Sequence, residues 1–430
     1  SRGSSGPGPS RRRFLAAALG SLGALSAAGG AAGASGAAAD PAGGRGDRRT
    51  KRGSTVSART RAAGPGFDPW IEVEEASLAA NAAAVRRLAG GRPIHAVIKN
   101  HGYGHGVVEA GRILARQAGV AGLAVVKVDE ALALREAGVE APVLHMGYAP
   151  DGAARALVDA GVSLSAFQAD DPERLGRLAD RAGRAVGVHV YLDTGMSRMG
   201  IPVEDALPWL ERLAAAPGVE IRGTYAAFVE EDEVDPVQIR RLRAFGGDAR
   251  AAGLDPGPLH AASTHGLFHR MPEAAFDRAR PGLALYGAYP VGADRSRAEL
   301  TPALRLRARV VRTERLEAGE GVTYGYEYVA EAPTWIATIP VGHADGYARR
   351  AVEGCRVLVG GETHPVIGAV SASHTIVEVG PEERVRVGDD AVLVGPDDPA
   401  VHPNAVSEAT GISVYDVLMH LSPGLPRRVV

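Results

Sequence analysis

The residues Ala121-Gly122-Leu123-Ala124-Val125-Val126, followed by the amphipathic stretch 129–137, decide the fold. A short and nearly continuous apolar run is typical of a strand buried on both faces, and the stretch after it has the polarity pattern of a surface helix. This alternation recurs along the chain, with further strands predicted at residues 94–99, 141–146, 164–168, 187–193, 220–228, 259–263 and 283–287 and helices at 171–182, 203–215 and 235–252. Eight such strands favour a (β/α)8 barrel over residues 69–300.

The rhythm changes after residue 300. The later stretches are strand-like and have few helical segments between them, at residues 304–316, 335–341, 356–359, 365–370, 375–379 and 391–394. They predict a mostly β C-terminal domain over residues 301–430, so the fold class is α/β with a separate β domain. Because barrels of this kind build their active sites at the carboxyl ends of the strands, we expect the chemistry at that face.

The N-terminal residues have a different composition. An arginine-rich start, SRRRFL at residues 10–15, precedes an Ala/Gly/Leu run to about residue 28 and the small residues Ala37-Ala38-Ala39. This pattern predicts a signal peptide at residues 1–39, with paired arginines that resemble the twin-arginine type, and a disordered linker at 40–68. The expected location is periplasmic or extracellular. The run is too short for a membrane anchor, and an Ala/Gly-rich tail is the alternative.

Composition excludes several classes of function. The 430-residue chain has a net charge of −2 with interspersed acidic and basic residues, which gives no basic patch for nucleic acid. Cys355 is the single cysteine, so neither an intrachain disulfide nor a cysteine-rich metal site can form within the chain.

The segment AVIKNHGYGHG at residues 96–106 is the most informative one for chemistry. Lys99 ends the first predicted barrel strand, where a partly desolvated amine could lose its proton and form a Schiff base. Taken alone, a lysine in this place is more often a solvated charge. The glycine spacing is not that of a dinucleotide-binding loop. His101 and His105 lack a carboxylate motif to complete a metal site, so no metal is expected.

Five further blocks follow in order along the chain: DTGMSRMG at 193–200, RPGLALYG at 280–287, VTYG at 322–325, GHADGY at 342–347, and Tyr415. Together with residues 99–106, this ordered set resembles the alanine racemase family over essentially everything after about residue 70. The resemblance implies a barrel followed by a β domain, a pyridoxal 5'-phosphate cofactor, and interconversion of L- and D-amino acids.

The resemblance also implies roles for single residues. Lys99 would hold the cofactor covalently and act as one base, and Tyr324 of the partner subunit would be the base on the opposite face. Arg198 would lie beside that tyrosine and the substrate carboxylate, and Arg280 would donate to the pyridine nitrogen. The cofactor phosphate would be bound by Tyr103, Thr264, Gly282, Leu283 and Tyr415. A homodimer with shared active sites acting on free amino acids is therefore expected.

The chemistry explains why these residue types occur together. Loss of the α-proton leaves a carbanion whose charge the cofactor ring spreads, and racemisation needs a base on each face of the carbon. An arginine keeps its proton, so it leaves the pyridine nitrogen unprotonated. The plainer alternatives are a core position for Tyr324 and an ion pair between Arg280 and Asp277.

Several positions depart from the family pattern. Ala227 stands in place of the histidine that packs on the cofactor ring, and Ser263 in place of an asparagine. At the substrate, His343 replaces a tyrosine, and Ala372-Ser373 replaces Met-Asp. One interpretation is a pocket enlarged for substrates bulkier than alanine. The other is an exported homologue that binds cofactor or ligand with lost or altered activity.

Overall fold

The computed structural model describes residues 66–430. The predicted signal peptide, residues 1–39, and residues 40–65 of the predicted linker lie outside the described residues. Within 66–430, none of the helices has both the length and the apolar character that a membrane span requires.

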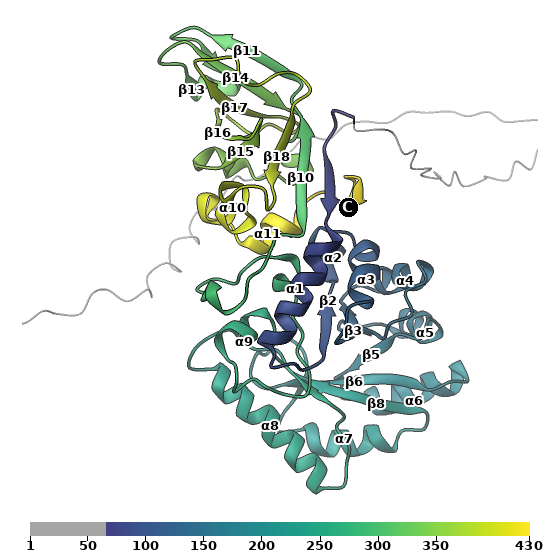
Figure 1. Cartoon of the computed structure of the whole chain (residues 1–430). Helices are drawn as coiled ribbons and strands as arrows, with labels where there is room; N and C mark the ends of the chain where they lie inside the picture. The colour runs from purple at the N-terminus through teal and green to yellow at the C-terminus, as the bar shows by residue number, and fades with distance from the viewer. Residues whose placement is uncertain (1–65) are drawn as a thin grey trace, which may run out of the picture. The chain divides into compact units, whose positions relative to one another are not determined.

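A parallel sheet forms most of the first domain, and helices separate its strands (Figure 1). Each neighbouring pair of strands is parallel, as expected when a helix connects one strand to the next. The strands, in order around the sheet, are β2 (Ile94–Val97), β3 (Val120–Val125), β4 (Val143–His145), β5 (Ser163–Ala166), β6 (Val186–Asp193), β8 (Val219–Tyr225) and β9 (Leu259–His260). The helices are α3 (Val107–Ala115), α4 (Val128–Glu136), α5 (Asp151–Asp159), α6 (Asp171–Ala182), α7 (Ala206–Ala215) and α8 (Asp235–Ala251). The predicted barrel is confirmed.

The ring closes through residues 278–281 rather than through the predicted strand 283–287. Single parallel bridges join Arg278 to β9 and Ala279 to β2. In addition, the amide of His95 donates to the Ala279 carbonyl at 2.8 Å.

The stretch predicted as the last strand instead forms the 3-10 helix η1 (Leu283–Tyr286). Its side chains are buried against α1 (Glu75–Leu88), where Asn81 Nδ2 donates to the Leu285 carbonyl at 3.1 Å. A short apolar run is equally compatible with a buried strand and a buried helix. The apolar pattern of residues 283–287 therefore could not distinguish the two, and the strand prediction was wrong.

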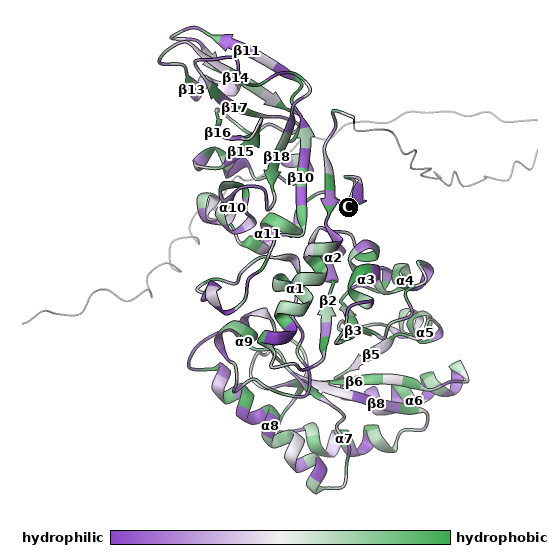
Figure 2. Cartoon of the chain, viewed as in Figure 1, coloured by the Kyte–Doolittle hydropathy of each residue, from purple (hydrophilic) through white to green (hydrophobic). Residues whose placement is uncertain are grey.

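The helices and strands bury different proportions of their residues. Strands β4 and β5 are buried along their whole length, whereas α8 buries one face only, and Figure 2 shows both hydrophilic and hydrophobic residues along it. Helix α6 begins with Pro172 in its first turn and ends at Gly183, whose φ of +63° a glycine adopts without strain. These local signals are why the helical predictions match the structure closely.

The second domain is mostly β, as predicted. It forms a nine-stranded, mostly antiparallel sheet. The predicted strand 304–316 is broken in two, and β1, which precedes the barrel, pairs antiparallel with β10 and parallel with β19. Both ends of the described chain therefore contribute to this sheet. Its strands, in order across the sheet, are β11 (Arg312–Leu316), β14 (Thr334–Ile339), β17 (Thr375–Gly380), β16 (Glu362–Ile367), β15 (Arg356–Val359), β18 (Asp390–Val394), β10 (Leu304–Arg309), β1 (Trp70–Val73) and β19 (Arg427–Val429). The helices α10 (Pro403–Thr410) and α11 (Val414–Met419) lie between β18 and β19 in the sequence.

Candidate active site

A cavity of about 360 Å³ opens at the carboxyl ends of the barrel strands. It gathers side chains from six separated segments of the first domain and from α11. Eight predicted site residues line it, namely Lys99, Tyr103, Arg198, Thr264, Arg280, Gly282, Leu283 and Tyr415. It is also lined by Ala227 and Ser263, two of the positions that depart from the family pattern.

Lys99 enters the cavity from a tight left-handed turn after β2. The turn, α2 (Lys99–Tyr103), has positive φ at His101 (+58°) and at Tyr103 (+52°), a conformation that costs energy for side chains other than glycine. The carboxylate of Glu130 stabilises it by accepting a hydrogen bond from the His101 amide at 2.9 Å. The backbone is thus held in a strained path directly after β2, which ends at Val97.

The electrostatic surroundings of Lys99 favour its neutral amine. Burial lowers the pKa of Lys99, and the nearby charge of Arg198 lowers it further, while Glu130 and Glu230 raise it in part. A neutral amine is the form that can attack a carbonyl or accept a proton.

Arg280 is fixed inside the barrel mouth. One terminal nitrogen donates to the His260 carbonyl at 2.5 Å and to His260 Nδ1 at 3.1 Å, and the other donates to the Ala226 carbonyl at 2.6 Å. These bonds use three of the five N–H groups of the guanidinium, so two remain for a ligand. Burial lowers the pKa of Arg280 to about 10, which still leaves it charged at neutral pH. The alternative pairing with Asp277 does not occur, because that carboxylate accepts from the Leu259 amide at 2.7 Å.

Hydroxyl groups and main-chain amides converge at another part of the cavity. Thr264 Oγ1 accepts from the amides of Gly282 at 3.2 Å and Ala284 at 3.1 Å. A Cβ on Gly282 would lie 2.3 Å from the hydroxyl of Tyr103, so only glycine leaves this space open. The ring of Tyr415 lies 6.1 Å from that of Tyr103, and burial raises the pKa of Tyr415 to about 12. Neutral hydroxyls and amides donate hydrogen bonds, and this set fits a phosphate group.

Arg198 is presented by a loop that is wrapped around one carboxylate. Asp193 Oδ1, at the end of β6, accepts from the amides of Gly195, Met196 and Ser197 at 2.9, 2.9 and 3.1 Å. This arrangement accounts for the Asp-Thr-Gly-Met sequence pattern, because the aspartate side chain organises the turn that carries the arginine.

Glu230 also lines the cavity, although the sequence did not predict it as a site residue. It has a φ of +66°, which is unusual for a residue with a side chain, and Ser263 Oγ donates to its carboxylate at 3.3 Å. Burial raises the pKa of Glu230. Its only sequence signal is an acidic run at residues 230–233, which is typical of a solvated loop and therefore gave no indication of the site.

The remaining predicted residues, Tyr324, His343, Ala372 and Ser373, do not line this cavity. Tyr324 is 78% exposed on η3 (Tyr324–Tyr326), which contradicts the alternative that it is a core tyrosine. The segment that contains His343 is hydrogen-bonded to the one that contains Ala372, through Ala344 N and the Ala372 carbonyl at 3.0 Å. Within one chain, these four residues therefore lie in the β domain, away from the cavity that contains Lys99.

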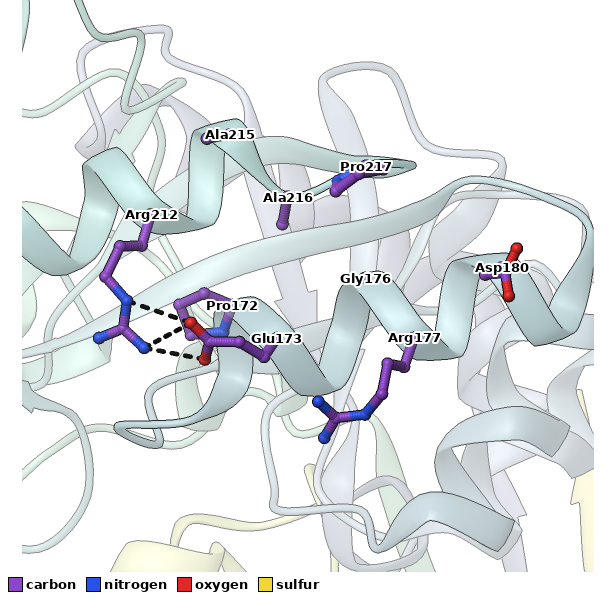
Figure 3. A pocket seen from close by; sticks show the side chains of 9 residues that line it. All are labelled: Pro172, Glu173, Gly176, Arg177, Asp180, Arg212, Ala215, Ala216 and Pro217. Atoms are coloured by element: carbon purple, nitrogen blue, oxygen red, sulfur yellow. Dashed lines mark hydrogen bonds and ion pairs between the residues drawn. The ribbon is translucent and has the colours of Figure 1, made fainter.

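A surface hollow separate from this cavity lies on the outer face of the barrel between α6 and α7 (Figure 3). Glu173 and Arg212 form a two-pronged ion pair there, with their closest atoms 2.7 Å apart. None of the sequence motifs contributes to this hollow. The chemistry is therefore placed in the cavity that contains Lys99.

Comparisons with known proteins identify the family to which the chain is similar. The chain matches the family models "Alanine racemase, N-terminal domain" over residues 73–290 and "Alanine racemase, C-terminal domain" over 303–429. It is 36% identical to the alanine racemase of Symbiobacterium thermophilum over 330 residues, covering 76% of this chain and 87% of that protein. It resembles the solved alanine racemase of Clostridium difficile 630 with a TM-score of 0.79 and 26% identity, covering 85% and 96% of the two chains. A histidine racemase from Leuconostoc mesenteroides gives a TM-score of 0.76 at 25% identity, covering 85% and 99%.

Proposed function

Because this chain belongs to the alanine racemase family of pyridoxal-phosphate-dependent amino-acid racemases, we propose that Lys99 and Tyr324 of the partner subunit are the two bases of its racemisation. The observation that carries the proposal is the division of the site residues. Lys99, Arg198 and the residues expected to bind the cofactor line a single cavity, whereas Tyr324 is exposed on another part of the chain.

The residues of the cavity fit the cofactor. Lys99 would bind it covalently, the converging hydroxyls and amides around Gly282 would bind its phosphate, and Arg280 would donate to its ring nitrogen. When bound, pyridoxal phosphate delocalises the negative charge left on the α-carbon by proton loss. Arg280 keeps its own proton, because its charged form persists well above neutral pH.

The two bases act on opposite faces of the α-carbon. The lowered pKa of Lys99 favours the neutral amine that can accept a proton, and the phenol oxygen of Tyr324 would exchange a proton on the other side. The positive charge of Arg198 would favour the phenolate of that tyrosine and bind the substrate carboxylate. Because Tyr324 is absent from the cavity of its own chain, a second copy must supply it, and the active unit is a homodimer.

We further propose that the site accepts side chains larger than that of alanine. Ala227 leaves the cavity without a ring at that position, and small side chains at Ala372 and Ser373 would narrow it little when a partner docks. The histidine racemase among the structural relatives acts on a larger amino acid according to its name, so this fold accommodates one.

Export of the protein remains a proposal from sequence alone, supported by the paired arginines and the apolar run after them. Cell fractionation of the full chain and of an Arg11→Lys/Arg12→Lys variant tests it. We expect the wild type in the periplasmic or extracellular fraction and the variant retained in the cytoplasm. An unchanged distribution would contradict a twin-arginine signal.

The reaction itself is tested by exchange of the α-proton. The cofactor-loaded protein is incubated in D2O with alanine, serine, methionine, lysine, arginine and histidine, and NMR and chiral chromatography follow exchange and inversion. Inversion of the larger substrates supports the enlarged pocket. Exchange of none of them would favour the alternative, an exported cofactor-binding homologue with lost or altered activity.

The shared site is tested by mixing two inactive variants. In a heterodimer of Lys99→Ala and Tyr324→Ala chains, one site lacks both bases and the other retains both. Random reassociation should therefore restore about a quarter of the wild-type activity, because half of the dimers then carry one intact site out of two. Mixtures that stay inactive although both variants dimerise would exclude a base contributed by the partner.

A further inference from the structure

The barrel has a second cavity at the end opposite to Lys99. It has a volume of about 330 Å³, and its polar lining consists of His95, Ser163, His189, Arg222 and Arg278. His95 is the second residue of β2, and Ser163 is the first residue of β5. These positions lie at the amino ends of parallel strands, so this cavity and the cofactor cavity open at opposite ends of the barrel.

The lining carries positive charge without acidic residues. Arg278 donates to His95 Nε2 at 3.1 Å and takes part in none of the ion pairs within residues 66–430. Arg222 donates to Ser163 Oγ at 3.2 Å and pairs only with Glu220, an exposed carboxylate outside the cavity lining. Two guanidinium groups therefore border a space that contains no counter-charge.

His95 holds Arg278 beside this space. Its side chain is 3% exposed, and its Nδ1 has no hydrogen-bond partner. Because its Nε2 accepts a hydrogen bond from Arg278, the ring proton must be on Nδ1. The neutral ring of His95 therefore holds Arg278 in place without compensating its positive charge.

A chain of hydrogen bonds connects this cavity to the cofactor cavity. Arg280 donates to His260 Nδ1 at 3.1 Å, so His260 carries its proton on Nε2 and donates to His189 Nδ1 at 2.9 Å. His189 in turn has its proton on Nε2 and lines the second cavity. The chain begins at the arginine assigned to the cofactor ring and ends at the second cavity.

We propose that this second cavity binds a small oxyanion such as inorganic phosphate, held by Arg278, Arg222 and the Nε2 proton of His189. Guanidinium groups match the oxygens of such an anion in geometry and charge. Through His189 and His260 the bound anion fixes the position of Arg280, and this coupling alone rests on the proposed role of Arg280 at the cofactor. The binding site itself is independent of the proposed function.

Calorimetric titration of the cofactor-loaded dimer with inorganic phosphate tests the site. Loaded protein is required because its other phosphate-binding position is then occupied. We expect saturable binding of one anion per chain, weakened about tenfold or more in Arg278→Gln. The matched control is Arg177→Gln, which changes an exposed arginine of the hollow between α6 and α7 and should bind as the wild type does.

Other outcomes are equally decisive. Absence of saturable binding, or equal affinities of Arg278→Gln and Arg177→Gln, would overturn the site. If Arg278→Gln does not fold, as judged by its thermal unfolding, Arg222→Gln replaces it with the same expectation. Sulfate and acetate titrations then distinguish a site for tetrahedral oxyanions from one for carboxylates. The visible absorbance of the bound cofactor should change along the same saturation curve, and binding without that change would overturn the coupling but leave the site in place.

Discussion

The two halves of the proposed active site differ in how far one chain completes them. In the barrel half, Arg280 is buried and three hydrogen bonds already hold it. The β-domain half is exposed, with Tyr324 accessible over most of its surface. We therefore expect a single chain to bind cofactor and a second chain to be needed for catalysis. Substitutions in the two halves should separate these properties.

Lys99→Ala should give the largest effect and abolish both properties. Without the amine, the cofactor has no covalent attachment and one face of the α-carbon has no base. We expect activity to fall by roughly a thousandfold or more, and the visible absorbance of the bound cofactor to change to that of free pyridoxal phosphate. Spectra and racemisation rates of the purified variant measure both. A variant that retained activity would remove Lys99 from the mechanism.

Tyr324→Phe should separate the two halves. The cofactor spectrum and affinity should be unchanged, because Tyr324 does not contact the cavity of its own chain. Racemisation should fall by about a hundredfold or more, since one face loses its proton donor and acceptor.

Tyr326→Phe is the matched control for Tyr324→Phe, because it removes another exposed hydroxyl, 66% exposed, from the same turn. It should leave activity near the wild-type value. Equal losses in the two variants would indicate a general disturbance of the turn and would argue against a base at Tyr324.

The sequence predicted the two halves to different depths. The barrel rhythm predicted the strands, and the resemblance of the motif blocks to a known family located most of the predicted cavity residues. The last barrel strand was misplaced onto Leu283–Tyr286, since a buried 3-10 helix and a buried strand have the same apolar composition. Glu230 was missed because its place in the cavity depends on a left-handed backbone conformation that an acidic run does not predict.

The second cavity shows the same limit more strongly. His95 is a single polar residue within an apolar stretch, and Arg278 lies far from it in sequence among the charged residues 277–280. Only the closure of the barrel through residues 278–281 brings them together. Their contact is long-range, so no local pattern could reveal it.

Gly282→Ala tests how closely the barrel half is fitted to a phosphate. The added methyl group would lie 2.3 Å from the Tyr103 hydroxyl and must displace it. We expect cofactor affinity to fall by about tenfold, with stability affected less than in a core overpacking variant. Absorbance titration with pyridoxal phosphate measures the affinity. Gly247→Ala, in α8 with open space around it, is the control and should bind normally.

Glu230→Gln should give the smallest effect and sharpens the comparison within the barrel half. Burial raises the pKa of Tyr103 and Tyr415, and the nearby charge of Glu230 raises both further. The same negative charge should repel the cofactor phosphate bound there. Burial raises the pKa of Glu230 itself, and protonation below that pKa removes the repulsion. Cofactor affinity should therefore decrease as pH rises through the Glu230 pKa.

The neutral variant should bind the cofactor a few-fold more tightly than the wild type at neutral pH, by roughly the energy of one screened charge pair. It should also lose that part of the pH dependence, which titrations at several pH values would measure. The control is Glu231→Gln, which neutralises the exposed neighbour outside the cavity and should leave both the affinity and its pH dependence unchanged. An identical pH profile in wild type and Glu230→Gln would mean that Glu230 turns away from the phosphate when cofactor binds. Its hydrogen bond with Ser263 would then break when cofactor binds.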